Sequence, residues 1–154
     1  MKRFLSVLVL VFSLLPGCQN DADDLSEGKI IFVKTIPGGC NNQDINEIKR
    51  SSVYPDTVKF TVRNDTLDIF VGINYICCAP FVTEAEIVDG SVVMTLVDNC
   101  PAPYQGCYCK CMCYYTWDFL FTDFDDKEYN YQVILTDPRE SGPVIFKEGV
   151  FEIR

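Results

Sequence analysis

The chain has 154 residues, of which 48% are hydrophobic, 13% aromatic and 23% charged. This length allows one domain with a sizeable core, and the composition is too apolar for a disordered chain. The absence of histidine excludes Ser-His-Asp and Cys-His catalysis and all zinc sites that use imidazole. The formal net charge of −9 argues against a nucleic-acid partner, which requires a basic patch.

Residues 1–17 are predicted to be a signal peptide rather than part of the fold. A positive start (MKR) precedes an apolar run over residues 4–15, which has signal-peptide length and is too short to span a bilayer. The run leads into LPGC at residues 15–18, which resembles the lipobox of bacterial lipoproteins. The resemblance implies that Cys18 carries lipid, becomes the mature N-terminus and anchors the protein to a membrane. The alternative is an ordinary secretory signal that is cut near Gly17.

Residues 18–28 are predicted to form a flexible acidic tether, because they are small, polar and rich in aspartate. Aspartates so close behind Cys18 resemble the export tag that sends some Bacteroidetes lipoproteins to the outer face of the outer membrane. A merely solvated linker is the alternative. We therefore expect a lipid-anchored protein at the outer membrane, facing the periplasm or the cell surface, with the surface favoured. Without residues 1–17, 11 basic residues face 22 acidic ones, a net charge of −11.

The cysteine count supports lipidation independently. Nine cysteines would leave one thiol unpaired in an exported protein. If Cys18 carries lipid, eight remain, enough for four disulfides in an oxidising compartment. The disulfide candidates are Cys40, Cys77, Cys78, Cys100, Cys107, Cys109, Cys111 and Cys113.

Residues 29–154 are predicted to form a single domain that begins with a short strand. Ile30–Ile36 is rich in β-branched residues, and the Pro-Gly-Gly of residues 37–39 is expected to end this strand. Residues 41–56 are polar. A capping-box spacing among them predicts one or two helical turns over Ile45–Arg50.

Two alternating segments follow, separated by a turn. Residues 58–62 alternate apolar with polar side chains, which predicts a half-buried strand, and Asn64-Asp65 predicts the turn after it. The second segment has a stripe of apolar side chains on one face of a predicted strand: Leu67, Ile69, Val71, Ile73, Tyr75 and Cys77. Cys78 must point away from this face unless the chain bends after Cys77.

A hairpin is predicted next. Residues 81–88 and 91–97 flank Asp89-Gly90, and Asp-Gly between β-branched runs is among the strongest hairpin signals. The two prolines of Asn99–Pro103 then predict a rigid loop that delivers the chain to the cysteine-rich segment.

That segment, residues 107–121, reads CYCKCMCYYTWDFLF. If it is extended, successive side chains alternate, so its four sulfurs and most of its large rings face one way. We therefore expect a central strand with a core face that is sulfur in its first half and aromatic in its second.

The end of the chain completes the expected fold. An acidic turn at 122–128 leads to an alternating segment at 129–135, and 144–154 gives one or two closing strands. About eight or nine strands with short turns and no long helix predict an all-β, antiparallel, immunoglobulin-like β-sandwich stapled by disulfides.

The order of the motifs also carries a resemblance. NYICC, a DG hairpin and CxCxC followed by an aromatic-rich strand, over about residues 66–136, resemble small cysteine-rich bacterial lipoproteins of the Bacteroidetes type. The resemblance implies an immunoglobulin-like sandwich. It carries no established activity, so no functional residue is transferred from it.

Metal binding and disulfide bonding compete as explanations for CxCxCxC. Residues i and i+2 of a strand lie about 6.8 Å apart, whereas zinc holds each sulfur at about 2.3 Å, so one extended run cannot wrap an ion. We therefore expect no metal and no other cofactor. The same spacing disfavours bonds within the run. If each bond joins a cysteine of the run to one outside it, the 105 possible pairings fall to about 24. A vicinal Cys77–Cys78 bond would break this scheme.

Other sites are weaker. A redox role for Cys77-Cys78 or Cys109-x-Cys111 lacks the helix N-terminus that usually activates a catalytic thiol. A calcium site in the acidic turn lacks a recognised loop spacing. Rings at strand spacing are more often core than a sugar-stacking platform. The calcium candidates are Asp123, Asp125, Asp126 and Glu128, and the platform candidates are Tyr115, Trp117, Tyr129 and Tyr131.

These observations favour a non-catalytic binding or structural lipoprotein of the cell envelope, anchored to a membrane by its lipid, with a protein or glycan ligand. The second hypothesis is an accessory carbohydrate-binding lipoprotein, which requires exposed coplanar aromatic rings. The third is a carboxylate-based hydrolase, which requires two acidic side chains in one cleft.

Overall fold

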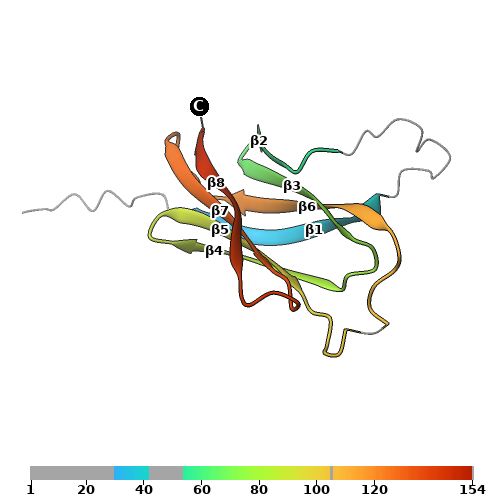
Figure 1. Cartoon of the computed structure of the whole chain (residues 1–154). Helices are drawn as coiled ribbons and strands as arrows, with labels where there is room; N and C mark the ends of the chain where they lie inside the picture. The colour runs from blue at the N-terminus through green and yellow to red at the C-terminus, as the bar shows by residue number, and fades with distance from the viewer. Residues whose placement is uncertain (1–29, 42–53, 105, 154) are drawn as a thin grey trace, which may run out of the picture.

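The computed structural model describes residues 30–41, 54–104 and 106–153 (Figure 1). Four expectations lie outside the described residues: the signal peptide at 1–17, lipid on Cys18, the tether at 18–28 and the helical turn over 45–50. The described part of the chain contains no helix that is long and apolar enough to cross a membrane.

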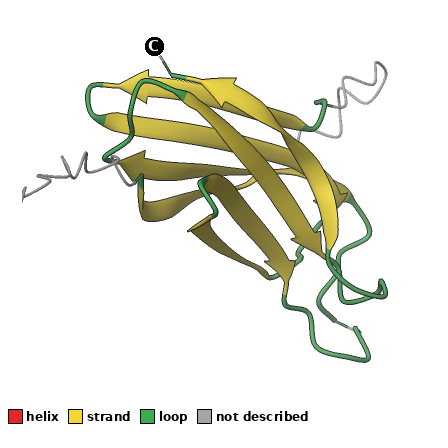
Figure 2. Ribbon diagram, turned by 90° about the vertical axis from the view of Figure 1, so that its left-hand side faces the viewer, coloured by secondary structure: helices red, strands yellow, loops and turns green. Residues whose placement is uncertain are grey.

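Eight strands form two four-stranded sheets that pack face to face, as Figures 1 and 2 show from two directions. The first sheet has the order β1-β6-β3-β2 and the second has the order β4-β5-β7-β8. The predicted all-β sandwich is therefore confirmed. The strands are β1 (Ile31–Asn41), β2 (Thr57–Arg63), β3 (Thr66–Ile76), β4 (Phe81–Val88), β5 (Ser91–Asp98), β6 (Met112–Thr122), β7 (Glu128–Thr136) and β8 (Val144–Glu152).

One strand pair departs from the antiparallel expectation. β5 and β7 run parallel, with Val92 opposite Tyr131 and Val97 opposite Thr136. The chain leaves the second sheet after β5, passes through β6 in the first sheet and returns as β7. A crossover of this kind brings the chain back in the same direction, so the two strands become parallel neighbours.

The alternating stripes of the sequence form the core. Every member of the stripe on β3, from Leu67 to Cys77, is buried, as are Tyr129, Tyr131 and Val133 on β7. The hairpin at Asp89-Gly90 is also confirmed. Both turn residues have positive φ (49° and 77°), the conformation of a type I′ turn, which an Asp-Gly pair accommodates well.

The first strand is longer than expected. β1 continues through Pro37 to Asn41, with register shifts between Phe32 and Lys34 and between Pro37 and Gly39. Proline is compatible with an edge strand or a bulge, because its missing N–H need not face a partner there. The prediction that Pro-Gly-Gly ends the strand was therefore wrong.

The central strand is shorter than expected. β6 begins at Met112, so only Cys113 of the four clustered cysteines lies inside a strand and in the core. Cys109 and Cys111 lie in the preceding loop and are exposed. The aromatic half of the expected core face is confirmed, because Tyr115, Trp117 and Phe119 are all buried.

The sandwich has two distinct ends. At one end β1 starts, with Ile31 opposite Thr122 at the end of β6, and we name it the Ile31 end. At the other end lie residues 77–80, 99–104, 106–111 and 137–143, which we name the stapled end. β1 runs from the first end toward the second, where Cys40 bonds to Cys113 (Figure 1).

Candidate functional site

The stapled end is held by four disulfides. Each of them joins one cysteine of the 107–113 run to one cysteine outside it, which confirms the expected pairing rule and excludes the vicinal bond. The bonds are Cys40–Cys113, Cys77–Cys111, Cys78–Cys109 and Cys100–Cys107.

Backbone hydrogen bonds explain why the run faces the end of β3. The N–H of Cys77 donates to the carbonyl of Cys111, and the N–H of Cys109 donates to the carbonyl of Cys77, both at 3.0 Å. These bonds continue the β3–β6 ladder beyond the strands. Cys78 has a φ of 69°, so the chain turns at this residue and its side chain meets Cys109 rather than following Cys77 into the core.

A disulfide and hydrogen bonds hold the loop between β5 and β6 in place. The Cys100–Cys107 disulfide closes it. The N–H of Tyr104 donates to the carbonyl of Pro101 at 2.8 Å. The Tyr104 hydroxyl donates to the carbonyl of Pro138 at 2.7 Å, which joins this loop to the one between β7 and β8.

A buried carboxylate lies beneath these loops. Asp98 is 2% exposed, and its oxygens accept three hydrogen bonds. They come from the hydroxyl of Tyr75 at 3.0 Å, the hydroxyl of Tyr108 at 2.7 Å and the N–H of Cys100 at 3.1 Å. A buried charge is stable only when its oxygens are satisfied in this way, so Asp98 binds the core to the loop.

Arg139 closes the network from the solvent side. Its guanidinium carbon lies 5.3 Å from the ring centroid of Tyr75 and 5.0 Å from that of Tyr108, which is cation–π geometry. It also pairs with Asp137 and donates to the Tyr75 hydroxyl at 3.1 Å. Strand ends and loops that are far apart in sequence therefore meet in one polar cluster, which consists of Tyr75, Asp98, Tyr108, Asp137 and Arg139.

Three side chains of the polar cluster, those of Tyr75, Tyr108 and Asp137, have shifted pKa values. Burial, reinforced by the hydrogen bond to Asp98 and by the negative charges of Asp98 and Asp137, raises the pKa of Tyr75. Burial and the bond to Asp98 raise the pKa of Tyr108 to about 12. The hydrogen bond from Arg139 lowers the pKa of Asp137 to about 2. The tyrosines therefore remain donors, and the Asp137–Arg139 pair remains charged.

The sequence contains one signal for this cluster that the predictions above do not use. Asp98 continues the inward-facing positions of β5, namely Val92, Met94 and Leu96, so its alternation places a carboxylate in the core. Arg139 carries no comparable signal, since it lies in a loop and 64 residues separate it from Tyr75.

The predicted aromatic platform is not a surface. Tyr115, Trp117, Tyr129 and Tyr131 are all at most 8% exposed. Tyr115 stacks on Trp117 with a centroid distance of 5.9 Å, and the ring of Phe81 packs edge-on against both. These four rings fill the core, so the interpretation that favoured core packing is confirmed.

Two groups of side chains were candidates for binding a metal ion, the clustered cysteines and the acidic turn. Among the described residues, the group of three close enough to share an ion is Cys40, Cys77 and Cys113, and all three sulfurs are in disulfides. In the acidic turn, Asp125 pairs with Lys127 at 3.5 Å, and its N–H donates to the hydroxyl of Tyr129. Within the described ranges, the acidic side chains of this turn form no comparable group.

A shallow cavity of about 360 Å³ lies elsewhere, where the edge strands β1 and β4 meet. Phe32 lines one side, and Glu84 and Glu86 are the acidic residues of its lining. These two residues are i and i+2 on one strand, which places their Cα atoms about 7 Å apart.

Comparison of the chain with protein-family models, with curated proteins and with solved structures finds no match.

Proposed function

We propose that the protein is a lipid-anchored lipoprotein of the cell envelope, whose sandwich presents its stapled end to a protein or glycan partner without catalysing a reaction. The observation that carries the proposal is that the chain enters the sandwich at the end opposite to the stapled end. The described chain enters the sandwich at the Ile31 end, and the stapled end lies opposite (Figure 1). A lipid on Cys18 would therefore hold the Ile31 end near the membrane and direct the stapled end away from it.

The construction of the stapled end supports a binding role. Loops at one end of a sandwich are common binding surfaces, because a rigid scaffold positions them. Here the disulfides, the polar cluster and the Tyr104–Pro138 hydrogen bond fix the loops before any partner arrives. A preorganised surface binds more tightly, since less conformational freedom is lost on association. Pro101, Ala102 and Pro103 are exposed on it.

Lipidation is tested by mass spectrometry of the protein extracted from bacterial membranes. We expect the mature chain to begin at Cys18 and to carry acyl groups. Cys18→Ala should release the protein from the membrane fraction. A mature chain cut elsewhere, with Cys18 present as an unmodified thiol, would refute the anchor.

Placement is tested on intact cells with a membrane-impermeant amine reagent. Lys110 at the stapled end should react if the protein is displayed on the cell surface, and Lys127 at the Ile31 end is the matched lysine nearer the anchor. Labelling of both lysines only after the outer membrane is opened would place the domain in the periplasm.

Binding is tested with a photo-crosslinking amino acid at Ala102 or, as the matched control, at Asp126 on the opposite end. We expect discrete crosslinked products from position 102 and none from position 126. Equal products from both positions, or products from position 126 alone, would overturn the assignment of the stapled end.

The hydrolase hypothesis has one structural candidate, the cavity that contains Glu84 and Glu86. An inverting glycoside hydrolase requires two carboxyl groups about 6.5–9.5 Å apart. Both glutamates are exposed, however, and they belong to an edge strand rather than to an enclosed cleft. Glycan hydrolysis that is lost in both Glu84→Gln and Glu86→Gln would establish this alternative in place of the binding role.

A further inference from the structure

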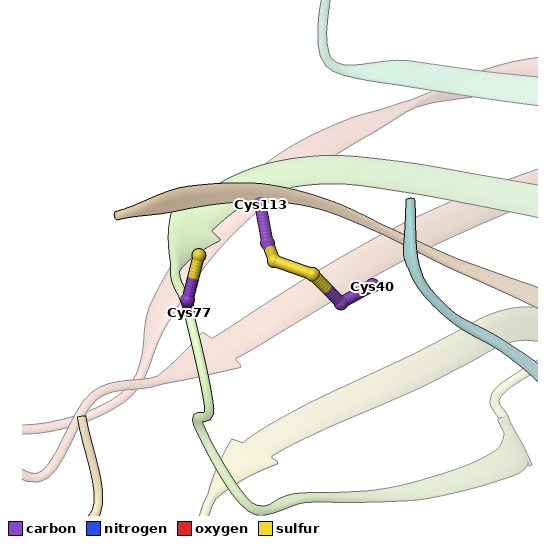
Figure 3. A group of neighbouring side chains, drawn as sticks. All are labelled: Cys40, Cys77 and Cys113. Carbon is purple, nitrogen blue, oxygen red and sulfur yellow. A yellow bond between two sulfur atoms is a disulfide. The ribbon is translucent and has the colours of Figure 1, made fainter. Parts of the chain in front are cut away.

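Two of the four disulfides lie side by side at the stapled end, and one cysteine of each is buried in the core. The sulfurs of Cys40, Cys77 and Cys113 all lie within 4.8 Å of one another, although Cys77 is bonded to Cys111 and not to either of them. Figure 3 shows the sulfur of Cys77 beside the Cys40–Cys113 bond, with the sulfur of Cys113 between the other two. Once its bond to Cys111 is broken, the sulfur of Cys77 can act as a nucleophile toward the neighbouring Cys40–Cys113 disulfide.

The two cysteines of each of these disulfides differ in exposure. Cys77 and Cys113 are each 2% exposed, whereas their partners Cys111 and Cys40 are exposed. Cys111 lies in the loop before β6, and Cys40 lies near the end of the edge strand β1. Each disulfide therefore joins one buried cysteine to one exposed cysteine, and the sulfurs of the two buried cysteines are neighbours.

We propose that these two disulfides form a thiol–disulfide exchange relay. A thiolate of an external protein or small thiol attacks the sulfur of Cys111, forms a mixed disulfide with it and releases the thiolate of Cys77. That thiolate attacks the sulfur of Cys113, forms a Cys77–Cys113 bond and releases the thiolate of Cys40. Two S–S bonds break and two form, so no net oxidation or reduction occurs.

The direction of the relay follows from hydration. A thiolate released at Cys77 is buried and loses most of its water, whereas a thiolate at Cys40 lies on the exposed edge. Transfer of the charge from the buried to the exposed sulfur is favourable, because desolvation of an ion is costly. Attack of an external thiolate on Cys111 therefore produces a reactive thiolate at Cys40, which can react with a second external disulfide. This activity goes beyond the proposed display role and does not depend on it.

The Cys111→Ser variant tests the relay within one molecule, because it leaves Cys77 without its partner. Trypsin separates the relevant cysteines: Cys40 lies in fragment 35–49, Cys77 in fragment 64–110 and Cys113 in fragment 111–127. The full chain is purified without reductant, alkylated with N-ethylmaleimide and digested. We expect an alkylated fragment 35–49 that is no longer linked, and fragment 64–110 linked to fragment 111–127.

The Cys109→Ser variant is the matched control. It frees Cys78, which is exposed and does not belong to the group of three close sulfurs. In this variant fragment 35–49 should stay linked to fragment 111–127, and the alkyl label should be on Cys78. Alkylation of Cys77 alone in Cys111→Ser, with Cys40–Cys113 intact, would overturn the proposal.

A second measurement uses the unmutated protein and does not depend on how the variants fold. Limiting glutathione is added and the reaction is quenched with N-ethylmaleimide. The relay predicts molecules that carry glutathione on Cys111 and the alkyl label on Cys40, with Cys77 bonded to Cys113. Glutathione on Cys111 together with the label on Cys77 would contradict the relay, as would release of Cys40 only when glutathione is on Cys113.

Discussion

The hydroxyl of Tyr108 donates a 2.7 Å hydrogen bond to the carboxylate of Asp98, which lies 2% exposed at the end of β5. This contact joins the cysteine-rich loop to the core by a charge-assisted bond, which is stronger than a hydrogen bond between neutral groups. Tyr75 donates to the same carboxylate from β3, so one buried side chain holds elements of both sheets.

Asp98→Ala should lower the free energy of unfolding by about 3 kcal/mol, because it leaves three donors without their acceptor. Tyr108→Phe removes one donor and should cost about 1 kcal/mol. Denaturant unfolding of the oxidised protein measures both. The exposed Asp126→Ala is the control and should change little. Equal losses in Asp98→Ala and Asp126→Ala would mean that the polar cluster does not stabilise the fold.

The Asp137–Arg139 pair predicts a pH dependence. Arg139 lowers the pKa of Asp137 from 3.8 to about 2, so the pair stabilises the fold above the ordinary pKa and loses that effect as the pH falls toward 2. Arg139→Gln should therefore cost about 1 kcal/mol at neutral pH, since the pair is partly exposed.

The difference in stability between the Arg139→Gln variant and the unmutated protein should shrink between about pH 5 and pH 2. Unfolding curves at a series of pH values measure it. Glu140→Gln, on the same loop, leaves the Asp137–Arg139 pair in place and should show no such trend. A constant difference across this range would place the effect of Arg139 in packing rather than in charge.

Loss of different disulfides should cost different amounts. Cys40 and Cys113 are separated by 73 residues and Cys100 and Cys107 by 7. A cross-link that closes a longer loop removes more entropy from the unfolded chain, so the two bonds should contribute about 4.5 and about 2.5 kcal/mol respectively to stability. Double alanine variants of each pair, compared by denaturant unfolding, should follow this order. The reverse order would show that local strain or packing outweighs loop closure.

Gly90→Ala should destabilise the protein by about 1 kcal/mol, because φ at this position is 77° and a side chain there is strained. An added Cβ would meet no atom within 4 Å, so the cost is purely conformational. Gly142→Ala is the matched control: that position is also open, but its φ lies outside the left-handed range. Thermal or denaturant unfolding should separate the two variants, and equal stability would exclude the backbone explanation.

Local patterns predicted most of the strands. The β3 stripe and the Asp-Gly hairpin depend on alternation and turn chemistry, which neighbouring residues determine, and the structure has both. The extension of β1 through Pro37 depends on its position at the edge of a sheet. The parallel pairing of β5 with β7 depends on how the two sheets stack. Neither the extension of β1 nor the parallel pairing can be predicted from a short stretch of sequence.

The stapled end was predictable in composition but not in shape. Spacing within the cysteine run correctly required partners outside it, yet the alternation suggested one continuous strand. The chain instead bends at Cys78 and forms a loop before Met112, because the disulfide partners and the Asp98–Tyr108 bond hold it there. Such contacts join residues that sequence periodicity cannot relate.

The pairing order has a consequence for biogenesis. Cys40 is the first of the eight bonded cysteines to be synthesised, and its partner Cys113 is the last. An oxidant that joined cysteines in the order of their synthesis would link Cys40 to Cys77 instead. The native bond forms only after the chain has been made as far as β6, so correct pairing requires either delayed oxidation or an enzyme that reshuffles early bonds.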